Sequence, residues 1–96
     1  MPAYLIVRAT VHDMAQYRQY MQHTPAILEK YGGEFLIRGG EKLVLEGTDS
    51  PERIVIIRFP SMQAAQDMYN SPEYQAAIKL RVNAAEASFV LMEGSA

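Results

Sequence analysis

The chain has 96 residues, of which 49% are hydrophobic and 21% charged, and its formal net charge is -2. This length fits a single domain with its own hydrophobic core, which we assign to residues 1–96. The absence of cysteine excludes disulfide bonds, thiolate catalysis and cysteine-based metal sites, and the slightly acidic balance gives no support for binding nucleic acid through bulk charge.

The N-terminal run MPAYLIVRAT has no basic segment and only a short apolar stretch, so it does not read as a signal peptide. No run approaches the ~20 apolar residues that span a bilayer. We therefore expect a cytoplasmic protein with no membrane partner. Residues 4–11 overlap this run, and they are mostly apolar and rich in residues that favour β-strands. They therefore predict a first strand.

The next segment predicts a helix. Asp13 is typical of an N-cap, and Gln16 completes a capping-box arrangement. Apolar residues then follow at helical spacing. Thr24 and Pro25 stand inside this pattern and predict a kink or a break, because proline lacks the amide hydrogen and suits a first helical turn.

Two glycine pairs bracket the second strand in the run YGGEFLIRGG, residues 31–40. Gly32 is expected to end the helix in a left-handed conformation, residues 34–38 to form the strand, and Gly39 and Gly40 to turn the chain. Neither GxGxxG nor GxxxxGK[ST] fits these glycines, and the run leads into a strand rather than a helix N-terminus. A phosphate-binding loop is therefore not indicated.

The second half of the chain again predicts the order strand, helix, strand, with its helical part divided in two. In chain order, a short extended segment at residues 42–46 is followed by a turn at 47–51 and a central strand at 53–59. Two helices then begin after the caps Ser61 and Ser71, and residues 87–93 form the last strand.

The resulting order β-α-β-β-α-β is that of a ferredoxin-like α+β fold, with four antiparallel strands and the helices on one face. We expect the first and third strands to be parallel neighbours, which would bring Arg8 and Arg58 near one end of the sheet. Residues 53–59 (RIVIIRF) are apolar on both faces, so the second face needs a cover. A second copy of the sheet is the simplest cover, which predicts a homodimer that forms sheet to sheet.

Several residues and short motifs follow one another in a fixed order along much of the chain: Tyr17, Tyr20, YGGEFLIRGG, Leu45 to Gly47, Pro51 with Arg53, Phe59 to Ser61, and Tyr69 to Tyr74. In this order and spacing they resemble the domain-of-unknown-function family 1330, within the dimeric α+β barrel superfamily. The resemblance implies the same sheet-to-sheet homodimer and carries no established activity. Relatives on this fold include cofactor-free monooxygenases, lactone isomerases and haem enzymes, so the fold does not decide the function.

Histidine and serine give no sign of a metal or nucleophilic site. His12 and His23 stand at opposite ends of the expected helix and form no ligand-spaced motif, so we predict no metal ion and no haem. Ser61 and Ser71 are explained as helix caps rather than nucleophiles. No fingerprint of a flavin or nicotinamide is present, and no cofactor is expected.

The arginines Arg8, Arg38 and Arg58 lie within apolar strands, where an unpaired guanidinium group is costly. One interpretation pairs each with a local carboxylate or lets it reach the sheet edge. Glu34, Glu46 and Glu93 are the candidates, with Glu46 favoured for Arg38. The other interpretation has these arginines bind a carboxylate or phosphate ligand.

Five tyrosines fall on the predicted helices: Tyr17, Tyr20, Tyr31, Tyr69 and Tyr74. They are either core residues whose hydroxyls find partners, or part of a pocket between helices and sheet lined by Tyr17, Tyr69 and Tyr74 and anchored by a strand arginine.

Three functions remain open at this point. The protein binds a small organic anion without catalysis, or it is a purely structural dimer without a pocket. Alternatively, it is a cofactor-independent enzyme of the monooxygenase or isomerase type, acting on a small aromatic or lactone metabolite with a tyrosine or histidine as the proton-transfer group.

Overall fold

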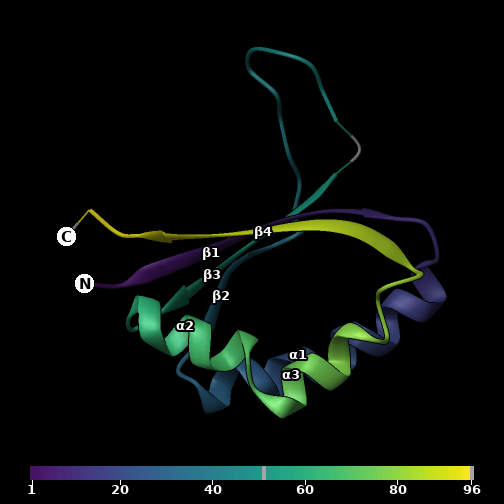
Figure 1. The fold of residues 1–96 in the computed structure, drawn as a ribbon. Coiled ribbons are helices and arrows are strands. Elements are labelled where there is room, and N and C mark those ends of the chain that lie inside the picture. The colour runs from purple at the N-terminus through teal and green to yellow at the C-terminus, as the bar shows by residue number, and fades with distance from the viewer. Residues whose placement is uncertain (51, 96) are drawn as a thin grey trace.

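The computed structural model describes residues 1–50 and 52–95 and shows a four-stranded antiparallel sheet with three helices on one face (Figure 1). The elements are β1 (Ala3–Val11), α1 (Met14–Lys30), β2 (Glu34–Arg38), β3 (Arg53–Phe59), α2 (Met62–Tyr69), α3 (Pro72–Ile78) and β4 (Ala85–Glu93). This is the ferredoxin-like α+β fold that the sequence predicts. Pro51, expected in a turn, lies outside the described residues.

The strand order in the sheet is β2-β3-β1-β4. β1 and β3 are neighbours but run antiparallel, with Tyr4 opposite Arg58 and Arg8 opposite Ile54. The expectation of parallel strands is therefore wrong, and Arg8 and Arg58 lie at opposite ends of the sheet. The reason is topological: the crossover through α1 returns β2 in the direction of β1, and the connection to β3 then reverses the chain.

Local capping explains where the helices begin and end. The side chains of Asp13, Ser61 and Ser71 each accept a hydrogen bond from the backbone amide three residues later, at 3.0–3.1 Å. After α1, Gly32 has a φ of 80°, the left-handed conformation predicted for a helix end. The caps thus divide the chain into elements as the sequence indicates.

The predicted break of α1 at Pro25 is wrong, because the helix continues through this residue. Proline has no amide hydrogen to give to the Met21 carbonyl. Two side chains supply the missing donors: Arg38 Nη2 lies 3.1 Å from that oxygen and Thr24 Oγ1 lies 3.4 Å from it. A tertiary contact from β2 thus compensates for a bond that the helix cannot make itself.

The core lies between the helices and the inner face of the sheet. Alternate residues of β1 and β3 point inward, and α1, α2 and α3 meet them with aromatic and sulfur-containing side chains. Tyr74, Phe59 and Met68 are the largest side chains that are fully buried. The inner face therefore holds one continuous core.

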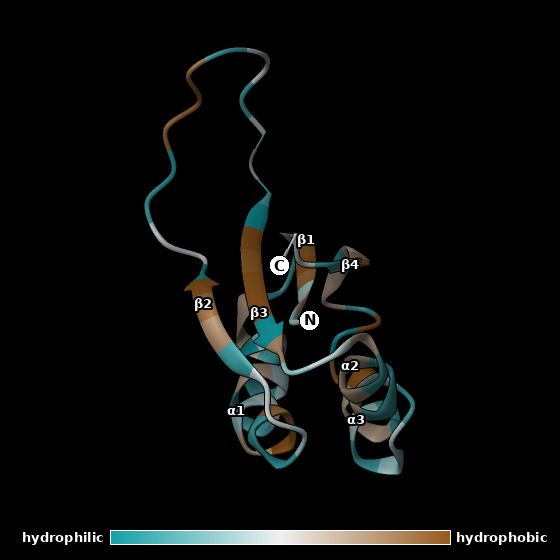
Figure 2. Cartoon of the chain, turned by 90° about the vertical axis from the view of Figure 1, so that its left-hand side faces the viewer, coloured by the Kyte–Doolittle hydropathy of each residue, from teal (hydrophilic) through white to brown (hydrophobic). Residues whose placement is uncertain are grey.

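The opposite, outer face of the sheet is also apolar. Ile6 and Ile56 face each other across β1 and β3, and Val90 and Met92 of β4 are 51% and 54% exposed. Figure 2 shows the hydrophobic colouring of β3 continuing along the strand. No element of the described chain covers this face (Figure 1).

Residues 39–50, called the arm below, leave the sheet between β2 and β3 without regular secondary structure. The predicted extended segment at 42–46 is thus not a strand, because no neighbouring strand lies beside it to pair with its backbone. The arm rises from the sheet on the side opposite the helices (Figures 1 and 2). Among the described residues, no helix has the length and apolar character needed to cross a bilayer.

Candidate functional site

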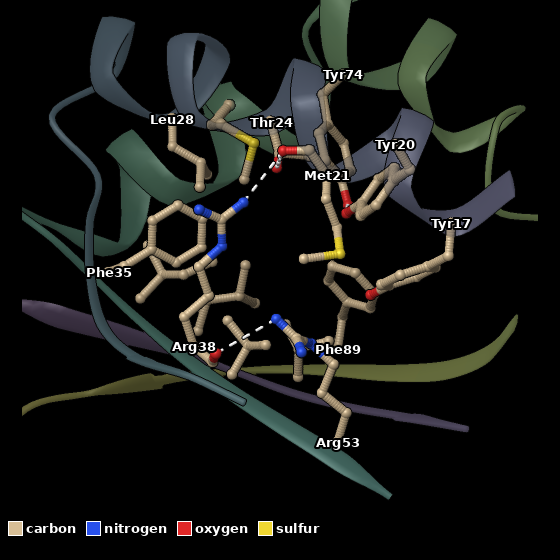
Figure 3. A pocket seen from close by; sticks show the side chains of 15 residues that line it. Tyr17, Tyr20, Met21, Thr24, Leu28, Phe35, Arg38, Arg53, Tyr74 and Phe89 are labelled. Atoms are coloured by element: carbon tan, nitrogen blue, oxygen red, sulfur yellow. Dashed lines mark hydrogen bonds between the residues drawn. The ribbon is translucent and has the colours of Figure 1, made fainter. Parts of the chain in front are cut away.

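A cavity lies between α1 and the inner face of the sheet, and fifteen side chains line it (Figure 3). Its floor is formed by aliphatic residues of β1 and β3, and the space open to the centres of water molecules is about 40 Å³. That volume holds a few waters. The polar groups that reach the cavity come from α1, α3 and the adjoining ends of β2 and β3, namely Tyr17, Tyr20, Thr24, Tyr74, Arg38 and Arg53.

Tyr20 and Tyr74 form a buried pair at one end of the cavity. Their hydroxyl oxygens are 2.6 Å apart, and either can be the donor. Burial raises the pKa of both phenols, so both are neutral at physiological pH. The guanidinium carbon of Arg81 lies 5.6 Å from the Tyr20 ring centroid and 4.6 Å from that of Phe89. The two hydroxyls thus share one hydrogen bond, and the cation of Arg81 lies close to the Tyr20 ring.

The hydroxyl group of Tyr17 points into the cavity (Figure 3). Its ring centroid lies 5.4 Å from that of Tyr20. Burial raises the pKa of its phenol, and the positive charges of Arg53, Arg81 and Arg38 offset part of this rise. Tyr17 is therefore a neutral hydrogen-bond donor in a region of positive potential.

Arg38 reaches the cavity from the end of β2. Besides its hydrogen bond to the Met21 carbonyl, its guanidinium carbon lies 4.4 Å from the centroid of the Phe35 ring. The expected ion pair with Glu46 is wrong, because none of the ion pairs in the described part of the chain includes Arg38. Glu46 instead belongs to the arm, which leads away from the cavity.

Arg53 is a second cavity arginine, one that sequence reasoning did not propose. It is the first residue of β3, and its Nη2 donates to the Arg38 carbonyl at 3.3 Å. Its side chain crosses Gly39, where an added Cβ would lie 2.4 Å from Nη1 of Arg53. The alternation of β3 offers a signal: Arg53 falls on the same face as Val55 and Ile57, which are buried.

The remaining predicted site residues lie elsewhere. Tyr69 is 37% exposed and lies beside Phe89 on a separate hollow between α2 and β4. Arg8 and Arg58 are exposed and alternate with the buried residues of their strands, which puts them on the outer face. Of the six candidates, Tyr17, Tyr74 and Arg38 share the cavity.

The side chains of the two histidines lie at the surface. His12 lies 3.9 Å from Glu86 at the surface, and His23 is exposed on α1. Neither lines the cavity. Within residues 1–50 and 52–95, no three His, Asp or Glu side chains gather in a way that could hold a metal ion.

These features define a ferredoxin-like α+β protein with an apolar cavity and two arginines at its edge. The chain belongs to the family described as Domain of unknown function (DUF1330), whose profile matches residues 2–95. No curated protein shows significant sequence similarity to the chain.

Solved structures share the fold at low sequence identity. A protein of unknown function from Rhodopseudomonas palustris superposes with a TM-score of 0.80 at 21% identity, covering 99% of this chain and 83% of its own. SnoaB, a cofactor-independent oxygenase from Streptomyces nogalater, gives 0.71 at 16% identity, covering 99% and 94%. A dimeric protein of unknown function and ferredoxin-like fold from Bacteroides fragilis gives 0.65 at 17% identity, covering 97% and 96%. At these identities the likeness shows the fold alone.

Proposed function

We propose that the protein binds a small aromatic organic anion in the cavity between α1 and the sheet, and that it acts as a homodimer. The observation that carries the binding proposal is the presence of Arg38 and Arg53 on an otherwise apolar and aromatic cavity. Neither arginine forms an ion pair with a carboxylate in the described part of the chain. Their planar guanidinium groups suit a carboxylate, and the aromatic walls suit a ring.

The hydrogen bonds that the two arginines make are ones that a ligand carboxylate would replace, so we expect the cavity to widen when a ligand binds. Arg38 binds the Met21 carbonyl, and Arg53 binds the Arg38 carbonyl. Both acceptors are neutral, and a carboxylate is the stronger acceptor for a guanidinium group. The cavity of about 40 Å³ is too small for an aromatic ring. We therefore expect ligand entry to draw Arg38 away from Met21 and widen the space beside α1.

The lining favours binding over acid–base catalysis. Within the described residues, no carboxylate and no imidazole lines the cavity. All three tyrosines are held in their neutral forms by burial. Donors that are fixed around an anion need no proton transfer, whereas general base catalysis needs a group that titrates near the working pH.

Binding is tested by thermal shift and calorimetry with benzoate and salicylate, using benzyl alcohol as the uncharged control. We expect both carboxylates to raise the melting temperature, and Arg38→Met and Arg53→Met each to remove most of that rise. Loss of one charge-assisted hydrogen bond costs about 1.5–3 kcal/mol, or roughly 10- to 100-fold in affinity.

Arg8→Met and Arg58→Met are the matched controls, because they remove the same charge from strands of the same sheet on its outer face. They lie on the face proposed for dimer contact and can change the melting temperature itself, but they should leave the ligand-induced shift unchanged. An equal loss of response in all four variants would show that bulk charge, and not the cavity, attracts the anion. A rise with benzyl alcohol equal to that with benzoate would mean that the arginines do not anchor the ligand.

The homodimer rests on the outer face of the sheet, which is apolar and uncovered in a single chain. A structure of the same fold from Bacteroides fragilis is described as dimeric. We expect a dimeric mass by sedimentation at micromolar concentration, with an interface of at least ~1,200 Å². A monomeric mass under these conditions would rule out this part of the proposal.

A cofactor-independent enzyme is the second candidate, favoured by the hydroxyl of Tyr17 beside the cavity arginines and by the fold shared with the oxygenase SnoaB. In that case the positive charges would favour loss of a proton from a bound phenol or enol to solvent water, and the neutral Tyr17 would be the proton donor to the anion that forms. Turnover of any thermal-shift hit, lost in Tyr17→Phe while binding persists, would distinguish this function from simple binding.

A further inference from the structure

The arm, residues 39–50, is fixed at its base. The Gly39 amide donates to the Ile54 carbonyl at 2.9 Å, which continues the pairing of β2 with β3. Lys42 joins the two sides of the arm by donating to the carbonyls of Ser50 and Glu52, and its Nζ lies 3.6 Å from Asp49. The arm therefore keeps a defined direction where it leaves the sheet.

The far part of the arm carries apolar side chains that contact little of their own chain. Leu43 is 81% exposed and Leu45 is 86% exposed, while Val44 between them is 37% exposed. Exposed leucines of this kind cost free energy in water and gain it on burial. Within one chain they have no core to join, because the arm stands clear of the body (Figures 1 and 2).

The arm rises on the side of the sheet that the helices leave uncovered (Figure 1). A second molecule packed on the outer face would therefore stand beside the arm. We propose that Leu43 and Leu45 of each subunit pack against the second copy of this chain, so that two arms clasp the dimer. This inference rests on the homodimer proposed above and adds to it the segment that holds the two sheets together.

Charge complementarity favours a second copy as the occupant. The outer face presents Arg8 and Arg58, which are exposed and form no ion pair with a described residue. The arm presents Glu41 and Glu46 on either side of its leucines, also outside the described ion pairs. The same face also holds Glu34, opposite Arg58, and Glu86, opposite Thr10. Complementarity therefore comes from the two arginines outside the described ion pairs: in a two-fold dimer each arm offers acidic and apolar groups to a face with two such arginines and apolar residues, and both contacts form twice.

The first test compares the dimer dissociation constants of wild type, Leu43→Asp, Leu45→Asp and the double variant by sedimentation over a dilution series. The matched control is Thr48→Asp, which adds the same charge to an exposed, polar position of the arm. We expect each leucine variant to weaken the dimer by about tenfold or more, since each buried leucine loses its transfer free energy. The control should stay within about threefold of wild type, because a surface charge has a small effect.

A second measurement locates the contact. The chain has no cysteine, so Leu45→Cys gives a single attachment point for a photo-activated cross-linker. Mixed dimers of unlabelled and isotopically heavy chains should give links between light and heavy peptides from the outer face. The monomeric fold should be intact in every variant by circular dichroism, because these leucines are exposed in the single chain.

The outcomes separate this inference from those on which it rests. A dimeric wild type whose dissociation constant is unchanged in the double variant, or links confined to one chain, would overturn the clasp and leave the homodimer in place. A monomeric wild type would overturn both. Benzoate binding is measured on the same proteins, so loss of the cavity function would be seen independently of either result.

Discussion

Truncation of Tyr74 to alanine is expected to lower the free energy of unfolding by about 3–5 kcal/mol, as for other large aromatic side chains in protein cores. Tyr74 is 1% exposed and is among the largest fully buried side chains. Its removal leaves a cavity against Phe89 and takes away the partner of the Tyr20 hydroxyl. Urea denaturation followed by circular dichroism measures the change. Tyr69→Ala is the matched control, because Tyr69 is 37% exposed and should lose far less.

Phenylalanine substitutions separate packing from hydrogen bonding at this pair. Tyr74→Phe alone should cost about 1–3 kcal/mol, because it leaves the buried Tyr20 hydroxyl without its partner. The double variant Tyr20→Phe/Tyr74→Phe should cost less than the sum of the two single variants, since no hydroxyl is then left unpaired. Additive costs would mean that the two hydroxyls do not depend on each other for their hydrogen bond.

The elements of the fold were predictable because their signals are local. Short apolar runs rich in β-branched residues predict β1 and β3, and the caps at Asp13, Ser61 and Ser71 lie beside the helices that they begin. Each of these signals needs only a few neighbouring residues. The division of the second helical part into α2 and α3 followed in the same way, from the serine and proline between them.

The wrong predictions depended on contacts between distant segments. Pro25 reads as a helix break until Arg38, from another element, supplies a donor to the carbonyl of Met21. The direction of β3 relative to β1 depends on the whole connection and not on either strand.

The candidate site was predictable in part, for the same reason. Tyr17 and Tyr74 reach the cavity because helix periodicity gives the face on which each lies. Arg38 reaches it because the pairing of β2 with β3 shifts between Phe35 and Ile37, which puts Arg38 opposite the inward-facing Val55. Periodicity also places Tyr69 on its helix, but which hollow it meets depends on how α2 packs. Arg53 enters the site because Gly39 leaves room for its side chain, and that contact joins the ends of two strands.

Gly33, in the run YGGEFLIRGG between α1 and β2, is expected to be sensitive to added volume. A Cβ at Gly33 would lie 2.8 Å from Cε1 and 3.1 Å from Cζ of Phe59, whose ring is fully buried. Since the core around this ring is close-packed, Gly33→Ala should cost about 1–3 kcal/mol. Gly40→Ala is the matched control, because nothing lies within 4 Å of a Cβ added there.

A change at Phe59 tests whether this ring is the cause. Phe59→Ala should itself cost about 3–5 kcal/mol, because the side chain is 0% exposed. Phe59→Leu is milder and lacks the two ring atoms that an added methyl group would meet. In a Phe59→Leu background, Gly33→Ala should therefore cost clearly less than in the wild type, a coupling that the double-mutant cycle reads directly. An equal cost in both backgrounds would place the conflict at the Leu28 carbonyl instead, which lies 3.1 Å from the same position. The glycine would then be required by the end of α1 and not by the core of the sheet.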